Sequence, residues 1–245
     1  MTRSPLRALT AAAVLVLALY LAGDAVPGVY MLTAPLRWLA TFAHETGHGL
    51  TALAVGGHFD RLVIFADGSG VATSSGVGCG APEAAVATGG LVGPALVAAL
   101  FFAFGTRPRF GRIGLALFGI AMLAVAGLFV RDAFGLAFSV GMGALMIVAA
   151  GRLSAAGAQT ALLFLALQLS LSVFSDRDYL FTAVAHTGRG DMPSDVAVVA
   201  TALGGPYWAW GVVIGAVSVG VLAFGLGILW VAQRLHGWQS RRALR

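Results

Sequence analysis

The sequence has no lysine, a single cysteine and few charged residues of any kind. Only 10% of its 245 residues are charged and 59% are hydrophobic, whereas a soluble globular domain carries about 25% charged residues. The chain lacks the polar groups needed to cover a water-exposed surface, which excludes a soluble enzyme and a disordered protein. Because Cys79 is the single cysteine, an internal disulfide and a zinc site built from cysteines are excluded as well.

All 15 basic residues are arginines, and they are scattered along the chain. Scattered arginines between apolar segments are typical of loops that anchor a protein at a membrane surface. A nucleic-acid-binding protein would gather its basic residues in a patch, so nucleic acid is excluded as a partner despite the net charge of +5. The expected partner is the lipid bilayer.

About seven segments are mainly apolar and close to the roughly 17–25 residues that a membrane-spanning helix needs. They cover residues 8–22, 35–55, 84–104, 113–130, 133–150, 155–174 and 207–231. The sequence therefore predicts an all-α polytopic membrane protein with about six to seven transmembrane helices.

The stretch that follows the second of these segments has a different pattern. From residue 58 it alternates loosely, it is rich in β-branched residues after Leu62, and it contains Asp67-Gly68, a turn dipeptide. This pattern predicts a β-hairpin over residues 62–74 that lies at the membrane surface.

A metal-binding motif lies inside the predicted span 35–55. His44-Glu45-Thr46-Gly47-His48 matches the H-E-x-x-H pattern, in which two histidines lie one helical turn apart on the same face. Both imidazoles can then bind one catalytic zinc ion, and the glutamate between them can act as general base on the metal-bound water. The motif predicts His44 and His48 as zinc ligands and Glu45 as the catalytic residue.

The cost of ionisable groups in a membrane supports this interpretation. Each such side chain near the centre of a spanning helix costs about 2.5–3.5 kcal/mol, so it is retained for function. The chain has five histidines and only two glutamates, and three of these seven residues lie within one five-residue stretch. Chance and ordinary packing do not account for that concentration.

A catalytic zinc site needs a third protein ligand. His58, His186 and His236 lie outside the apolar spans, where solvated histidines are the ordinary case. Asp195 directly precedes an apolar run, and it is equally suited to the first turn of a helix. The spacing leaves Asp195 as the first candidate, with Asp178 and Asp191 as alternatives.

Together these features resemble the site-2 protease family of intramembrane zinc metallopeptidases, in particular its small bacterial members without a PDZ domain. The resemblance rests on the HETGH motif, on Asp67-Gly68-Ser69-Gly70-Val71 and on Gly89-Gly90-Leu91-Val92-Gly93-Pro94, and it runs from about residue 36 to 210. It implies one integral membrane domain over residues 1–245, with an N-terminal helix 8–22 and an arginine-rich tail 233–245 at its periphery.

The resemblance also implies the third ligand. Asp195 matches the aspartate of a Ser-Asp motif that is followed by Thr201 and Pro206, so zinc would be held by two histidines and this distant aspartate. The better-known members carry their aspartate in Leu-Asp-Gly after an Asn-x-x-Pro run, and neither pattern occurs in this chain.

The position of Asp195 raises a question of topology. Four predicted spans separate it from the HETGH motif, which lies near the middle of its own span, whereas Asp195 lies at the start of an apolar run. The two can meet if residues 195–203 form a half-helix that re-enters the membrane, and the break at Gly204-Gly205-Pro206 favours this arrangement.

The predicted function is that of an intramembrane zinc metalloprotease, which hydrolyses peptide bonds of membrane-spanning or membrane-adjacent substrates in the bacterial cytoplasmic membrane. A membrane scaffold that has lost proteolysis and a metal-dependent transporter are the alternatives. Membrane orientation stays open. With seven crossings, nine arginines fall on the side of the C-terminus and six on the other side, while Arg3 and Arg7 favour the opposite orientation.

Overall fold

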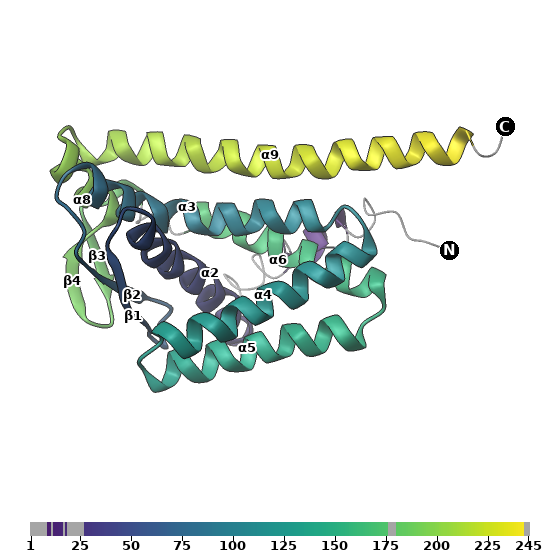
Figure 1. The fold of residues 1–245 in the computed structure, drawn as a ribbon, viewed down its shortest axis with the longest axis horizontal. Coiled ribbons are helices and arrows are strands. Elements are labelled where there is room, and N and C mark those ends of the chain that lie inside the picture. The colour runs from purple at the N-terminus through teal and green to yellow at the C-terminus, as the bar shows by residue number, and fades with distance from the viewer. Residues whose placement is uncertain (1–8, 11, 17, 19–26, 176–179, 243–245) are drawn as a thin grey trace.

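The computed structural model describes residues 9–10, 12–16, 18, 27–175 and 180–242, which form a mostly helical bundle with two short hairpins (Figure 1). The elements in chain order are α2 (Pro27–Ala54), β1 (His58–Ile64), β2 (Gly70–Ser75), α3 (Ala81–Phe104), α4 (Pro108–Phe129), α5 (Ala133–Arg152), α6 (Ala155–Ser175), β3 (Val184–Thr187), β4 (Gly190–Pro193), α8 (Asp195–Leu203) and α9 (Tyr207–Arg242).

Five of the described helices are long and apolar enough to cross a membrane, namely α3, α4, α5, α6 and α9. The expected number of six to seven is not reached among the described residues. Residues 8, 11, 17 and 19–22 of the predicted span 8–22 lie outside them. Helix α2 is long enough, but the polar residues of the HETGH motif lower its hydropathy below that of the other five.

Figure 1 shows α3, α4, α5 and α6 running back and forth through the bundle, with α9 alongside α3. The two hairpins and α8 gather at one end of these helices. We call this the hairpin end, and it comprises β1 to β4, α8 and the connection 130–132. That connection belongs to it because Arg131 donates its backbone N–H to the carbonyl of Leu62 in β1.

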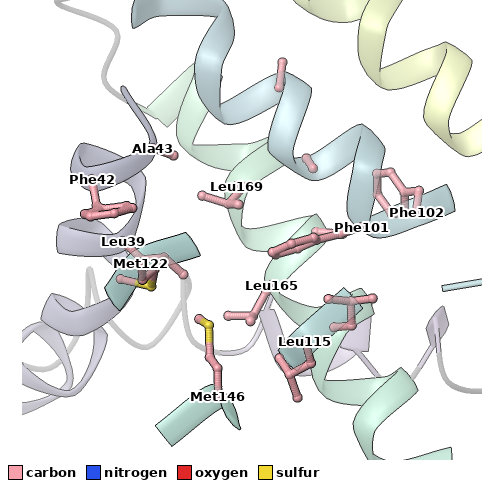
Figure 2. Close-up of a cluster of buried hydrophobic side chains, with 14 of the residues drawn as sticks. Leu39, Phe42, Ala43, Phe101, Phe102, Leu115, Met122, Met146, Leu165 and Leu169 are labelled. Atoms are coloured by element: carbon pink, nitrogen blue, oxygen red, sulfur yellow. The ribbon is translucent and has the colours of Figure 1, made fainter. Parts of the chain in front are cut away.

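The helices are held together by an apolar core of aliphatic, aromatic and methionine side chains (Figure 2). It combines Leu39 and Phe42 of α2, Phe101 and Phe102 of α3, Met122 of α4, Met146 of α5, and Leu165 and Leu169 of α6. Because lipid is as apolar as this core, close packing rather than exclusion of water holds such helices together. The core thereby fixes α2 against α3 and α6.

The predicted hairpin is confirmed. Strands β1 and β2 pair in antiparallel fashion, with Leu62 opposite Ala72 and Ile64 opposite Gly70. Gly68 in the connecting turn has a φ of 99°, a conformation that favours glycine. The outer edge of β1 is covered, since Asp132 Oδ1 also accepts the N–H of Ile64 at 3.2 Å.

A second hairpin was not predicted. Residues 184–193 lie outside the apolar spans found in the sequence, and β3 and β4 pair there in antiparallel fashion. The Gly188-Arg189-Gly190 turn allows this tight connection. The tips of the two hairpins are joined, because the N–H of Gly188 donates to Ser69 Oγ at 3.0 Å.

Helix α2 differs from the predicted span 35–55 in where it begins. It starts at Pro27, so Pro35 lies inside the helix. The motif residues 44–48 therefore lie in the last turns of α2, and His48 is only six residues from its end at Ala54, about 9 Å along the axis. The expectation that the motif lies in the middle of its helix was wrong, and the motif belongs to the hairpin end.

Candidate metal centre

The two motif histidines face the same point from successive turns of α2. Their Nε2 atoms are 3.0 Å apart, and the rings stand nearly perpendicular, with centroids 4.7 Å apart. The spacing of four residues produces this arrangement, because residues i and i+4 lie one above the other on a helix.

Asp195 completes the group from α8. Its Oδ2 atom lies 3.0 Å from His44 Nε2 and 3.4 Å from His48 Nε2. Helix α8 has only nine residues and ends at Leu203, because the next residue, Gly204, has a φ of 83° that breaks the helix before α9. The separate short helix expected from Gly204-Gly205-Pro206 is thus present, and its first residue meets the histidines.

The geometry of these three atoms fits a metal ion. In a tetrahedral zinc site with ligand bonds of about 2.0–2.2 Å, neighbouring ligand atoms lie about 3.3–3.5 Å apart. The observed separations of 3.0, 3.0 and 3.4 Å come close to that triangle. Among the described residues, these three form the one group of histidine, cysteine and acidic side chains that is compact enough to hold an ion. Two imidazole nitrogens and one carboxylate oxygen are a donor set that suits zinc and leaves a fourth position open.

The orientation of His48 is set by α3. The carbonyl of Val86 lies 2.8 Å from His48 Nδ1, so the ring directs its Nε2 towards Asp195. Such a contact to the second ring nitrogen fixes the tautomer of a metal-binding histidine. The imidazole ring of His48 packs directly against Gly90. A Cβ atom at position 90 would overlap the ring, so this position has room for glycine alone.

Close backbone contact of α2 and α3 makes this arrangement possible. A Cβ atom on Gly47 would overlap the carbonyl of Gly89, and one on Gly93 would lie 2.7 Å from the carbonyl oxygen of Ala43. Any larger residue at these glycines would push the helices apart. The Gly89-Gly90 and Gly93 positions therefore bring α3 close enough to support the motif.

Asp195 is positioned by its neighbour Ser194, which is 1% exposed. The Ser194 hydroxyl accepts the N–H of Ala197 at 3.2 Å and so caps α8. The same hydroxyl donates to the carbonyl of Thr182 at 2.6 Å, and the Ser194 N–H donates to the carbonyl of Ala183. Two hydrogen bonds thus hold the start of α8 against the chain that precedes β3, and a third caps the helix.

Glu45 lies on the face of α2 next to the histidines. Side chains of this face form hydrogen bonds with the first hairpin. Trp38 Nε1 donates to the carbonyl of Ala66 at 3.2 Å, and the Thr41 hydroxyl donates to the carbonyl of Gly68. One turn further along, Glu45 Oε2 accepts the N–H of Ala72 at 2.6 Å.

Glu45 is 5% exposed and lines the same cavity as the two histidines. A Cβ atom on Gly70 would lie 2.8 Å from Glu45 Cγ, so the missing side chain at position 70 makes room for this glutamate. The hairpin therefore holds Glu45 in place as well as being held by it.

A cavity of about 370 Å³ opens onto this group. It is lined by β2, by the second hairpin and by His44, Glu45, His48 and Asp195. Strand β2 contributes Gly70, Val71, Ala72 and Ser74, and the second hairpin contributes Ala185, Thr187, Met192 and Pro193. The three candidate metal ligands, the buried Glu45 and strand β2 therefore line the same cavity.

The other residues considered from the sequence lie elsewhere. Asp191 pairs with His186, at 2.6 Å between Oδ1 and Nδ1, and both side chains are exposed on the second hairpin. His58 is exposed at the start of β1. Asp178 and the side chain of His236 lie outside the described residues.

Sequence reasoning missed the groups that act through the backbone. The carbonyl of Val86 and the N–H of Ala72 are backbone groups, which almost every residue type carries. The sequence therefore does not reveal their role. The one available signal was Gly89-Gly90, which indicated a close approach of α3 without indicating to what.

Comparison with known proteins agrees with this geometry. Searches of curated proteins and of solved structures returned no match. A family of peptidases, described as Peptidase M50B-like, matches residues 8–225, which include α2, both hairpins and α8. The chain therefore belongs to the Peptidase M50B-like family, which confirms its resemblance to the site-2 proteases.

Proposed function

We propose that this chain is an intramembrane zinc endopeptidase. One observation carries the proposal: the ligand atoms of His44, His48 and Asp195 form a compact triangle next to buried Glu45, in a chain of a peptidase family. His44, His48 and Asp195 would hold one catalytic zinc ion. Asp191 and Asp178 take no part in this assignment.

When bound there, zinc supplies Lewis acidity, which lowers the pKa of a coordinated water towards about 7 and polarises the scissile carbonyl. Glu45 accepts the proton of the attacking water as its oxygen bonds to the carbonyl carbon. As the C–N bond breaks, Glu45 passes this proton to the leaving nitrogen, so the products are a new carboxylic acid and a new amine, and the proton of the acid then passes to the amine or to water. The Ala72 N–H, bonded to Glu45 Oε2, holds the carboxylate in orientation through both steps.

The substrate is proposed to be a membrane-spanning or membrane-adjacent peptide that is unwound at the cleaved bond, because a helix hides its backbone carbonyls. The outer edge of β1 is already used by Arg131 and Asp132, whereas β2 lines the cavity. Backbone N–H groups alternate between the two edges of a strand. Residues 70 and 74 therefore share the outer edge with Ala72. Because Glu45 takes the N–H of Ala72, an unwound substrate can pair with this edge as an added strand through residues 70 and 74.

The proposed setting is the bacterial cytoplasmic membrane. We propose that α2 and the segment 8–22 join the five apolar helices there, to a total of six to seven. The whole chain then acts as one membrane domain, with its core at about residues 36–210.

The proposal is tested by comparing purified wild type with Glu45→Gln for zinc content and for cleavage of a membrane-protein library. Glutamine keeps an oxygen that can accept the Ala72 N–H, so the fold and the zinc should stay while cleavage is lost. Glu83→Gln is a matched control, because Glu83 is the other glutamate of the chain and lines the same cavity. This control should cleave normally.

Wild type without zinc refutes the proposal. If all three proteins hold zinc and none of them cleaves, the result favours a scaffold that has lost proteolysis. Equal cleavage by wild type and Glu45→Gln removes Glu45 from the chemistry.

A further inference from the structure

The second hairpin is held in place at both ends. At its base, two hydrogen bonds from Ser194 hold the chain that precedes β3. At its tip, the N–H of Gly188 donates to Ser69 Oγ of the first hairpin at 3.0 Å. A Cβ atom on Gly188 would lie 2.5 Å from Cγ of Phe65, so the Phe65 ring packs directly against this turn. The second hairpin is therefore fixed relative to both α8 and the first hairpin, beside which it lies in Figure 1.

The two faces of this hairpin differ in polarity. Residues paired across an antiparallel ladder lie on the same face, and neighbours along a strand lie on opposite faces. His186 pairs with Asp191, and their side chains are 80% and 69% exposed. Ala185 pairs with Met192, and together with Thr187 they lie on the other face, where all three are half-buried and line the cavity. We call these three residues the inner face.

The inner face is uncharged and does not belong to the packed core. Among the described residues, neither of the two clusters of buried apolar side chains includes Ala185 or Met192. The hydroxyl of Thr187 is already used, because it donates to the carbonyl of Gly190 at 2.9 Å. Methionine is unbranched and flexible, so Met192 can adapt to apolar side chains of several shapes. The inner face thus offers apolar contact to whatever occupies the cavity.

Met192 is also close to the candidate metal ligands along the chain. Only Pro193 and Ser194 separate it from Asp195, and Ser194 is buried and hydrogen-bonded. The inner face, strand β2 and the three candidate ligands line the same cavity of about 370 Å³. A substrate chain that pairs with β2 and places a carbonyl at the metal ligands therefore contacts the inner face as well.

We propose that the inner face, and above all Met192, binds an apolar side chain of the substrate beside the cleaved bond and selects for it, an inference that rests on the proposed function. A charged side chain at this position would lose its hydration without gaining a partner, which is unfavourable. A side chain the size of leucine would instead bury apolar surface against Met192 and Ala185. Met192 is thus a specificity-determining residue, and the favoured substrate carries an apolar residue at the cleaved bond.

Photo-cross-linking tests this contact without cleavage. In Glu45→Gln protein, the photoreactive residue p-benzoyl-phenylalanine replaces Met192 or, as a matched control, His186 on the outward face. The probe is a single-span peptide of leucine and alanine with an Asn-Gly pair that unwinds its helix. We expect a cross-linked product from position 192 and only background from position 186. A product from position 186 alone, from both positions alike or from neither overturns the proposal.

Binding selectivity tests the chemistry of the contact and needs no bulky label. Three forms of the probe carry leucine, alanine or aspartate next to the Asn-Gly pair, and their affinities for Glu45→Gln protein are measured. We expect the leucine form to bind about 10-fold or more tightly than the aspartate form. Adding Met192→Ala should reduce the preference for leucine over alanine by about 4-fold, the contribution of one buried methylene group.

Two further variants separate this contact from general damage to the hairpin. Met192→Leu keeps an apolar side chain and His186→Ala changes the outward face alone, so both should keep the preference for leucine. An unchanged preference in Met192→Ala, or an equal loss in His186→Ala, overturns the role of Met192. Neither measurement depends on cleavage. Wild type that cleaves no peptide counts against the proposed function, whereas a missing cross-link counts against the inner face.

Discussion

Asp195 Oδ2 lies 3.0 Å from His44 Nε2, although four apolar helices separate the two residues in the chain. They meet because both lie at the hairpin end: the HETGH motif occupies the last turns of α2, and Asp195 is the first residue of α8. One ligand is thus delivered by a nine-residue helix with its own hydrogen bonds. Changes that loosen α8 should release metal before they unfold the bundle.

Ser194→Ala tests this relationship. The substitution removes the cap on Ala197 and the hydrogen bond to Thr182, and loss of such a cap costs about 0.5–2 kcal/mol. We expect zinc to be lost at a lower chelator concentration than in the wild type, while thermal unfolding of the helical bundle changes little. Thr201→Ala is the control, because Thr201 also bonds within α8 but lies away from its first turn. Equal zinc retention in the wild type and Ser194→Ala contradicts the positioning role of Ser194.

Gly90→Ala tests the support of His48. The added methyl group overlaps the imidazole, so the ring must leave the carbonyl of Val86. Loss of an outer partner of a metal-binding histidine lowers metal affinity roughly 10–100-fold. The measurement is titration with Co²⁺, whose visible absorption reports both affinity and ligand geometry.

A second glycine separates this effect from general damage to a helix. Gly141→Ala adds a methyl group in α5, where nothing lies within 4 Å, and should bind Co²⁺ like the wild type. If Gly90→Ala gives the wild-type spectrum and affinity, the fit of His48 against Gly90 is irrelevant to the site.

Ser74→Pro tests pairing of the substrate with β2. Proline removes the N–H at residue 74 on the outer edge of this strand, which lines the cavity. Loss of one backbone hydrogen bond of about 0.5–1.5 kcal/mol predicts roughly a 2- to 12-fold lower kcat/KM. Ser74→Ala keeps the N–H and should cleave like the wild type. Cleavage of a reporter substrate measures both, and an unchanged rate in Ser74→Pro argues against strand addition at this edge.

The parts of the fold that could be predicted from the sequence are those marked by side chains. Apolar runs located α3, α4, α5, α6 and α9, since each run is bounded by arginines, aspartates or glycines. Alternation and Asp67-Gly68 located the first hairpin. The spacing of four residues placed His44 and His48 on one face of a helix.

The rest depended on relationships that no local pattern contains. The second hairpin is too short for alternation to be visible, and polar residues such as Arg189 and Asp191 obscure it. Helix α2 starts at Pro27, eight residues before the predicted span 35–55, and the shorter span places the motif near its middle. The meeting of Asp195 with the histidines was expected by resemblance, and spacing alone left Asp178 and Asp191 as alternatives.

The central claim is that His44, His48 and Asp195 together hold one zinc ion. The most direct measurement is the zinc content of purified wild type, Asp195→Asn and Asp191→Asn after dialysis against a weak chelator. We predict one zinc ion per chain in the wild type and in Asp191→Asn, whose aspartate is exposed and pairs with His186. In Asp195→Asn the affinity should fall by at least the roughly 100-fold that loss of an outer partner can cost, leaving little zinc. Full zinc in Asp195→Asn, or none in the wild type, would contradict the account.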